Sequence, residues 1–189
     1  MVGALGSGAA DNQLPDDGRA LFATTTLPNE ALAEIGRAVA HFAILERTLV
    51  RVVQGLLGLH MSREGDRVGH ILTSEQSYRG LLELSTSLIQ ELREAELAEE
   101  YKTVLKTVAT AEEERNLLSH SLWGMNGAPH LVDKPLLRTK YTAKRRKGLT
   151  HRREELSLDD LRANAFKISL ATVDLGNFAS QRLGIFTDY

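Results

Sequence analysis

The sequence predicts an all-α fold: an antiparallel four-helix bundle with a basic loop or β-hairpin inserted before the last helix. Apolar residues recur three and four positions apart along four long segments, which is the spacing of amphipathic helices. Residues 130–156, between the third and fourth segments, have few apolar and many basic residues. The composition, 42% hydrophobic and 25% charged, fits a globular protein and excludes a chain that is disordered throughout.

The sequence divides into a short tail and one domain. Residues 1–26 show no sustained period and predict a flexible tail, whereas residues 27–189 form the helical domain. No apolar stretch approaches the roughly 18 residues of a membrane span, and residues 1–10 do not resemble a signal peptide. The chain has no cysteine, and its histidines lack metal-ligand spacing. We therefore expect a cytoplasmic protein with no membrane partner, no metal and no cofactor.

The first helix is predicted over residues 28–57, with Pro28 in its first turn. Gly55, Gly58 and the polar run 62–69 indicate its end. Its apolar stripe consists of Ile35, Val39, Phe42, Leu49, Val53 and Leu56.

Two further helices are predicted over residues 74–94 and 95–123. Thr73 and Gln76 have the spacing of a capping box at the start of the former. Gly124 follows the latter directly and indicates its end.

The last helix is predicted from Ser157, which forms a capping box with Asp160, to about residue 183. Within the insertion, residues 135–142 and 149–156 are candidate partner strands of a hairpin.

Two charged residues interrupt the apolar stripes. Glu46 lies in the rhythm of the first helix and Arg115 in that of the third. A charge on a face that should be dry costs several kcal/mol, roughly, unless it has a partner. Either the two side chains pair with each other or extend from the edge of the core, or Arg115 points into a cleft that receives an anion.

The residues around Arg115 carry a motif. Arg115 is followed by the polar Asn116 and, after four intervening residues, by His120. This resembles the signature of the HEPN superfamily, a group of small helical-bundle nucleases. The pairs Arg146/His151 and Arg63/His70 have similar spacing, but neither shares the apolar helical frame of Arg115.

The resemblance implies metal-independent cleavage of RNA through attack of a 2′-hydroxyl on the adjacent phosphorus. Histidine can accept and donate protons near neutral pH, and a guanidinium can stabilise charge on the phosphorane. Arg115 and His120 are the candidate catalytic residues, with Asn116 and Glu46 in support. Because five positions on a helix do not return to one face, the resemblance implies a homodimer with a composite site.

The insertion supplies a candidate RNA-binding surface. Between residues 138 and 153 lie eight basic and no acidic residues, although the whole chain has a net charge of −2. Such a segment favours a polyanion. The candidate RNA-binding residues are Arg138, Lys140, Lys144, Arg145, Arg146 and Lys147.

The resemblance implies a toxin or an antiphage-defence effector, with a cognate antitoxin as a possible partner. The alternative is a non-catalytic bundle, such as an antitoxin or regulator, that binds nucleic acid or a protein. In that case Arg115 would be a structural ion pair with Glu46. Trp123 is expected in the core or at a dimer interface.

Overall fold

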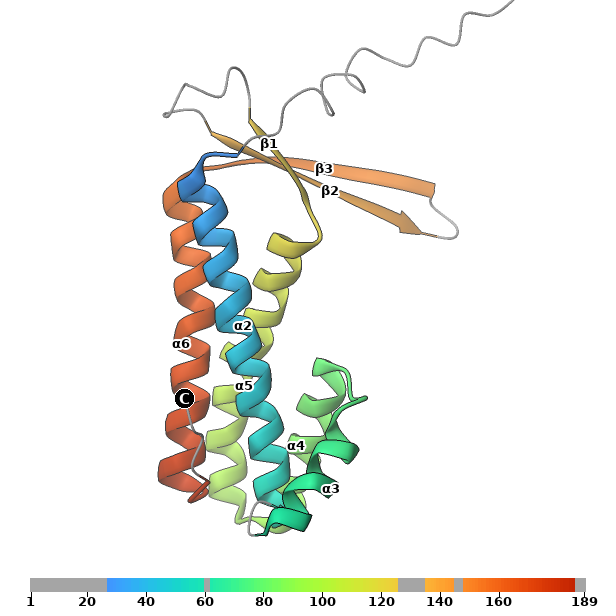
Figure 1. The fold of residues 1–189 in the computed structure, drawn as a ribbon, viewed down its shortest axis with the longest axis vertical. Helices are drawn as coiled ribbons and strands as arrows, with labels where there is room; N and C mark the ends of the chain where they lie inside the picture. Colours follow the sequence, from blue (N-terminus) through green and yellow to red (C-terminus); the bar gives the residue numbers. More distant parts are fainter. Residues whose placement is uncertain (1–26, 60–61, 126–134, 145–147, 186–189) are drawn as a thin grey trace, which may run out of the picture.

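The computed structural model describes residues 27–59, 62–125, 135–144 and 148–185. The predicted tail, residues 1–26, lies outside these ranges. The described part is mostly helical, with a small antiparallel sheet at one end of the helices (Figure 1). Its elements are α2 (Asn29–Leu56), α3 (Arg63–Thr73), α4 (Tyr78–Leu92), α5 (Ala95–Ser119), β1 (Leu122–Met125), β2 (Leu136–Lys144), β3 (Gly148–Leu156) and α6 (Leu158–Arg182).

Helix α2 lies within one residue of its predicted bounds at each end but has a broader buried face than its predicted stripe. Phe42 and Leu49 are buried, whereas Val39 is 46% exposed. Ala38 and Leu45, outside the predicted stripe, are completely buried. Helix α2 packs against α6 as well as against α4 and α5, so that residues on two sides of the predicted stripe are also covered.

Helix α3 was not predicted, and its presence corrects the prediction for residues 62–76. Ser62 caps its first turn by accepting a hydrogen bond from the backbone N–H of Gly65, at 3.0 Å. Thr73 is the last residue of α3, so the predicted capping box of Thr73 and Gln76 is wrong. The apolar residues of α3, Val68, Ile71 and Leu72, have helical spacing but are exposed, and only Gly69 and Thr73 are buried.

Helix α4 begins at Tyr78, four residues later than predicted, with Ser77 as its N-cap. The Ser77 hydroxyl accepts a hydrogen bond from the Gly80 backbone N–H at 3.0 Å. Deeper in the core, the Tyr101 hydroxyl of α5 donates to the Ser85 hydroxyl of α4 at 2.8 Å. This buried bond fixes α4 against α5.

Helix α5 ends at Ser119 instead of Trp123, because nearby side chains satisfy its last carbonyls. The hydroxyls of Ser119 and Ser121 donate to the carbonyls of Arg115 and Leu117. The indole N–H of Trp123 donates to the Leu118 carbonyl at 2.9 Å. Trp123 lies in β1 and packs against the core, as expected.

The predicted hairpin is confirmed and belongs to a three-stranded antiparallel sheet in the order β1–β2–β3. Its register pairs Leu136 with Leu156 at one end and Lys144 with Gly148 at the other. Strand β1, whose first two residues were predicted as the end of the third helix, pairs with β2 from Leu122 to Met125. The far end of the hairpin extends sideways beyond the helices (Figure 1).

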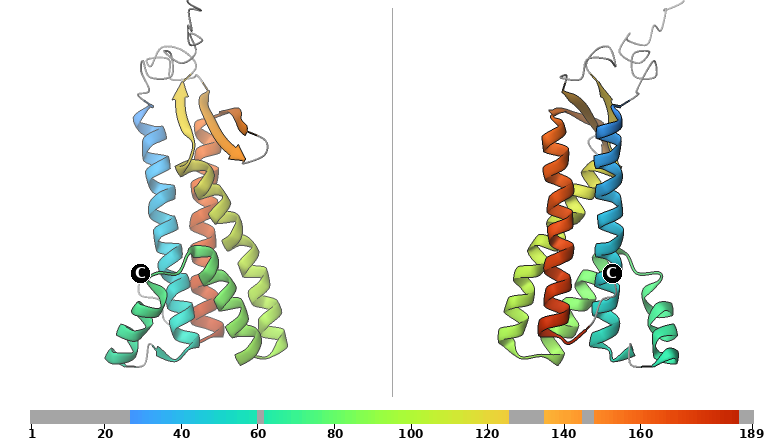
Figure 2. Two further views of the ribbon diagram at one scale, coloured as in Figure 1. Left: turned by 90° about the vertical axis from the view of Figure 1, so that its right-hand side faces the viewer. Right: turned by 60° about the vertical axis from the view of Figure 1, so that its left-hand side comes forward.

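Helix α6 starts at the predicted capping box, in which Ser157 and Asp160 bond to each other's backbone N–H. The Ser157 hydroxyl also donates to the Asp160 carboxylate at 2.7 Å, and this bond, together with the one from the Ser157 backbone N–H, holds the pKa of the Asp160 carboxyl below its usual range. Helices α2, α4 and α6 run in one direction and α5 runs in the opposite one (Figures 1 and 2). The strictly alternating arrangement that we predicted is therefore not observed, because α3 adds one reversal of the chain.

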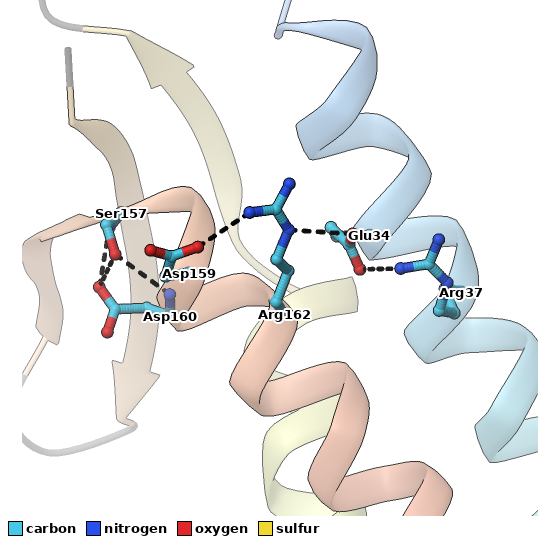
Figure 3. A network of polar contacts seen from close by, with 6 residues as sticks. All are labelled: Glu34, Arg37, Ser157, Asp159, Asp160 and Arg162. Carbon is cyan, nitrogen blue, oxygen red and sulfur yellow. Dashed lines mark hydrogen bonds and ion pairs between the residues drawn. The ribbon is translucent and has the colours of Figure 1, made fainter. Parts of the chain in front are cut away.

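A network of charges joins the start of α6 to α2 (Figure 3). The Glu34 carboxylate, 8% exposed, pairs with Arg37 of its own helix and with Arg162 of α6. Arg162 also pairs with Asp159 at 2.9 Å. At the other end of α6, Arg182 binds Glu100 of α5 at 2.6 Å. None of the described helices is both long and apolar enough to cross a membrane.

Candidate functional site

Arg115 lies between α5 and α2 and is partly buried. Its guanidinium carbon is 4.3 Å from the centre of the Phe42 ring, a cation–π arrangement. Its Nε is buried and has no hydrogen-bond partner; among the described residues it is the one buried side-chain nitrogen or oxygen in that condition. This donor is therefore desolvated without compensation.

Glu46 does not form the ion pair that would have made Arg115 a structural residue. Among the described residues, no carboxylate pairs with Arg115, and Glu46 itself is partly buried. Glu46 instead lies close enough to the Tyr78 hydroxyl for its charge to change the pKa of that group. Burial raises the pKa of Tyr78, the carboxylates of Glu112 and Glu46 raise it further, and Arg115 acts in the opposite direction.

Tyr78 and Phe42 complete the surroundings of Arg115, and the sequence did not single out either for this role. Their ring centres are 4.7 Å apart. The Tyr78 hydroxyl donates to the Val108 carbonyl at 3.1 Å, which holds the start of α4 against α5. Sequence reasoning could place Phe42 on the core face, but it could not show which helix Phe42 would meet.

His120 follows α5 directly and is exposed. Its φ of −108° and ψ of 20° depart from helical values, so the helix ends at this residue. Asn116, in the last turn of α5, is partly buried, and its carbonyl accepts a hydrogen bond from the His120 backbone N–H at 3.1 Å. The structure thus places one half-buried cation and one exposed imidazole near the same helix end.

The basic insertion is divided between structural and exposed charges. Arg138 is 8% exposed and pairs with Glu154 across the hairpin, so its side chain is committed to the fold instead of to RNA. Lys140 is partly exposed on the same strand. The side chain of Lys144 and residues 145–147, which include Arg145, Arg146 and Lys147, lie outside the described parts of the chain.

Neither of the two hollows described on the surface is lined by Arg115 or His120. One, of about 340 Å³, lies between α2 and α6 beside the ion pairs of Glu34. The other, of about 400 Å³, lies between α4 and α5. Across the ranges that the structure describes, no three His, Asp or Glu side chains are grouped so as to hold a metal ion.

The fold and these residues define a mostly helical protein with a three-stranded sheet at the end of the helices where the candidate residues lie. Comparison of the chain with models of protein families, with curated proteins and with solved structures gives no match.

Proposed function

We propose that the protein is a metal-independent endoribonuclease of the HEPN type. One observation carries the proposal: Arg115 is half-buried, held over Phe42, and not neutralised by a carboxylate of the described residues. A guanidinium kept in this condition is well suited to an anion that arrives from outside the chain.

The reaction that fits these groups is transesterification within RNA. The 2′-oxygen forms a bond to the adjacent phosphorus while the bond from phosphorus to the 5′-oxygen breaks. One proton leaves the 2′-hydroxyl and one is added to the departing 5′-oxygen: His120 makes one of these transfers and solvent water makes the other, while Arg115 stabilises the charge on the non-bridging oxygens. The products end in a 2′,3′-cyclic phosphate and a 5′-hydroxyl. DNA lacks the attacking hydroxyl and is not cut.

Glu46 and Asn116 have supporting roles in this proposal. Glu46, near Tyr78, contributes negative charge on the α2 side of Arg115. Asn116 precedes His120 by one helical turn, so that its amide can orient the imidazole or contact a phosphate. Because Arg115 is partly buried and His120 is exposed, we propose a homodimer in which the two groups act together across the interface. A toxin or defence effector, controlled by a cognate antitoxin, is the biological role that the motif favours.

The test is cleavage of a mixed, end-labelled RNA in the presence of EDTA. We expect the parent protein to cut, and His120→Ala and Arg115→Ala to lose activity by at least about 100-fold. His70→Ala and Arg79→Ala are matched controls, because these residues are exposed on α3 and α4. Cleavage that survives His120→Ala, or that is equally lost in the controls, would overturn the assignment.

The second candidate function is a non-catalytic bundle that binds nucleic acid through the hairpin. It is favoured by the charge of the far part of the hairpin, residues 139–144 and 148–153, which contain basic but no acidic residues. A parent protein that binds RNA in EDTA without cutting it would support this reading.

A further inference from the structure

Two aromatic rings face each other across the hairpin. Tyr141 of β2 and His151 of β3 are register partners, and their ring centres are 6.1 Å apart at an interplanar angle of 40°. Tyr141 is 44% exposed, and His151 is also exposed. The sequence has a single aromatic residue of the Phe, Trp or Tyr type in the basic segment, so only strand pairing reveals that a second ring lies beside it.

These rings lie on the face of the sheet that points away from the helical core. Side chains alternate between the two faces of a strand. Leu136 and, across from β2, Trp123 and Met125 pack against the core, which defines the inner face. Tyr141 is an odd number of positions from Leu136 and therefore belongs to the outer face, together with His151.

An exposed cation completes this surface. Arg153 is exposed and lies two residues from His151 on the same strand, hence on the same face. The acids of the hairpin, Glu154 and Glu155, follow at its near end, where Glu154 pairs with Arg138 and Arg152. We call Tyr141, His151 and Arg153 the hairpin platform.

The register also places the platform near the candidate catalytic histidine. Leu122 of β1 pairs with Thr139 of β2. His120 precedes Leu122 by two residues, and Tyr141 follows Thr139 by two residues, on strands that run in opposite directions. His120 and Tyr141 are thus each two residues along the chain from the Leu122/Thr139 pair, where the end of α5 leads into the sheet (Figure 1).

We propose that the hairpin platform stacks an unpaired base of single-stranded RNA, with Arg153 on the neighbouring phosphate, and so positions the strand at His120. This inference rests on the proposed ribonuclease function and names its substrate class. Single-stranded RNA is recognised through bases that stack on aromatic rings, whereas bases of a duplex are already stacked and not available. If the ring pair only stabilised the hairpin, the rings would add nothing to RNA binding beyond the electrostatic attraction of the basic residues.

The experiment measures binding with the His120→Ala protein in EDTA, so that RNA is not consumed. The probes are a short labelled single-stranded RNA, the same RNA annealed to its complement, and inorganic polyphosphate, which has charge but no bases. The main variant is Tyr141→Thr, because threonine suits a strand and keeps the hairpin. Tyr141→Phe, which keeps the ring, is the matched control.

We expect Tyr141→Thr to weaken binding of the single-stranded RNA by about 5- to 100-fold, the loss of one base stack. Tyr141→Phe should stay within about twofold of the parent, and polyphosphate should bind both variants equally. Arg153→Ala should weaken binding of both polyanions. It should also reduce, by about 1, the slope of the logarithm of the binding constant against the logarithm of the salt concentration.

Two results would overturn the platform. In one, Tyr141→Thr binds the single strand as the parent does; in the other, it loses polyphosphate and RNA to the same extent, which would show a loss of fold or charge. The ribonuclease proposal is tested separately, by cleavage with the unmodified protein. If the parent protein cuts RNA and Tyr141→Thr binds single-stranded RNA as the parent does, the platform proposal is refuted and the ribonuclease proposal stands.

Discussion

The guanidinium of Arg115 lies over the ring of Phe42, 4.3 Å from its centre, and its buried Nε has no hydrogen-bond partner. The cation–π contact contributes about 0.5–2 kcal/mol, and the unsatisfied donor costs about 1–3 kcal/mol. The two effects are of similar size, so Arg115 adds little to the stability of the fold. The packing of Arg115 therefore gives no stability argument for a guanidinium at this position.

Replacement of Arg115 by methionine is therefore expected to separate activity from stability. Arg115→Met keeps an unbranched side chain of similar length and removes the unsatisfied donor. We expect the free energy of unfolding to stay within about 1 kcal/mol of the parent or to rise, while RNA cleavage is lost. Urea unfolding and the EDTA cleavage assay measure the two quantities. A loss of more than about 3 kcal/mol would identify Arg115 as a structural residue.

A composite site predicts that two inactive variants restore activity when mixed. A dimer of one Arg115→Ala and one His120→Ala protomer retains one Arg115 and one His120 on opposite protomers. If the site forms across the interface, a mixture of the two variants should recover up to about a quarter of parent activity, because random exchange makes half the dimers mixed and each has one site. Analytical ultracentrifugation establishes the dimer. Mixtures that stay inactive although subunits exchange would show that the site lies within one protomer.

Arg138 and Lys140 should respond differently to substitution, although both belong to the same basic strand. Arg138→Ala leaves the partly buried Glu154 with only the exposed Arg152 as a partner and should destabilise the protein by about 1–3 kcal/mol. Lys140→Ala should leave stability within about 0.5 kcal/mol and lower the salt slope of RNA binding. Thermal unfolding and RNA titrations at several salt concentrations test the pair. Equal stability of both variants would contradict the structural role of Arg138.

The buried tyrosines predict a loss of stability at alkaline pH. Burial raises the pKa of Tyr101 from 10.0 to about 12, and the pKa of Tyr78 is raised as well. Between pH 10 and 12 the unfolded chain loses a proton that folded Tyr101 retains, so the free energy of unfolding falls with pH by up to about 1.4 kcal/mol per unit. The contribution is complete below pH 10.

Tyr101→Phe should reduce this dependence. The variant loses the hydrogen bond to Ser85 and should be less stable at neutral pH by about 1 kcal/mol. Its stability should then decline less steeply than that of the parent above about pH 10. Urea unfolding at a series of alkaline pH values gives both slopes, and parallel slopes would show that Tyr101 ionises as readily in the folded chain.

The sequence predicted those elements whose caps and side-chain alternation are set by residues close in the chain. The capping box at Ser157 and the hairpin of β2 and β3 are observed as predicted, because hydroxyl caps and strand alternation depend on near neighbours. Helix α3 and strand β1 were missed for different reasons. The apolar residues Val68, Ile71 and Leu72 of α3 have helical spacing, but they are exposed and lie in or directly after the polar run that was predicted to end the first helix. Strand β1 continues an apolar pattern that also suits a helix.

The candidate site divides in the same way. The resemblance to the HEPN signature singled out Arg115, Asn116 and His120, and the apolar rhythm predicted that Arg115 falls on an inward face. The sequence could not determine whether Glu46 neutralises Arg115, because that depends on how α2 is rotated against α5. It also assigned Arg138 to RNA, whereas pairing with Glu154 depends on the register of β2 and β3.

By itself, the sequence determined the helical character of this protein, the hairpin, the basic segment and the positions of the motif residues. These follow from the period of apolar side chains and from charges that are close in the chain. Only the tertiary structure decided that Arg115 meets Phe42 instead of a carboxylate, and that Tyr141 and His151 form one exposed surface. Those relationships join residues on different elements, and helix rotation and strand register, which no local pattern specifies, bring them together.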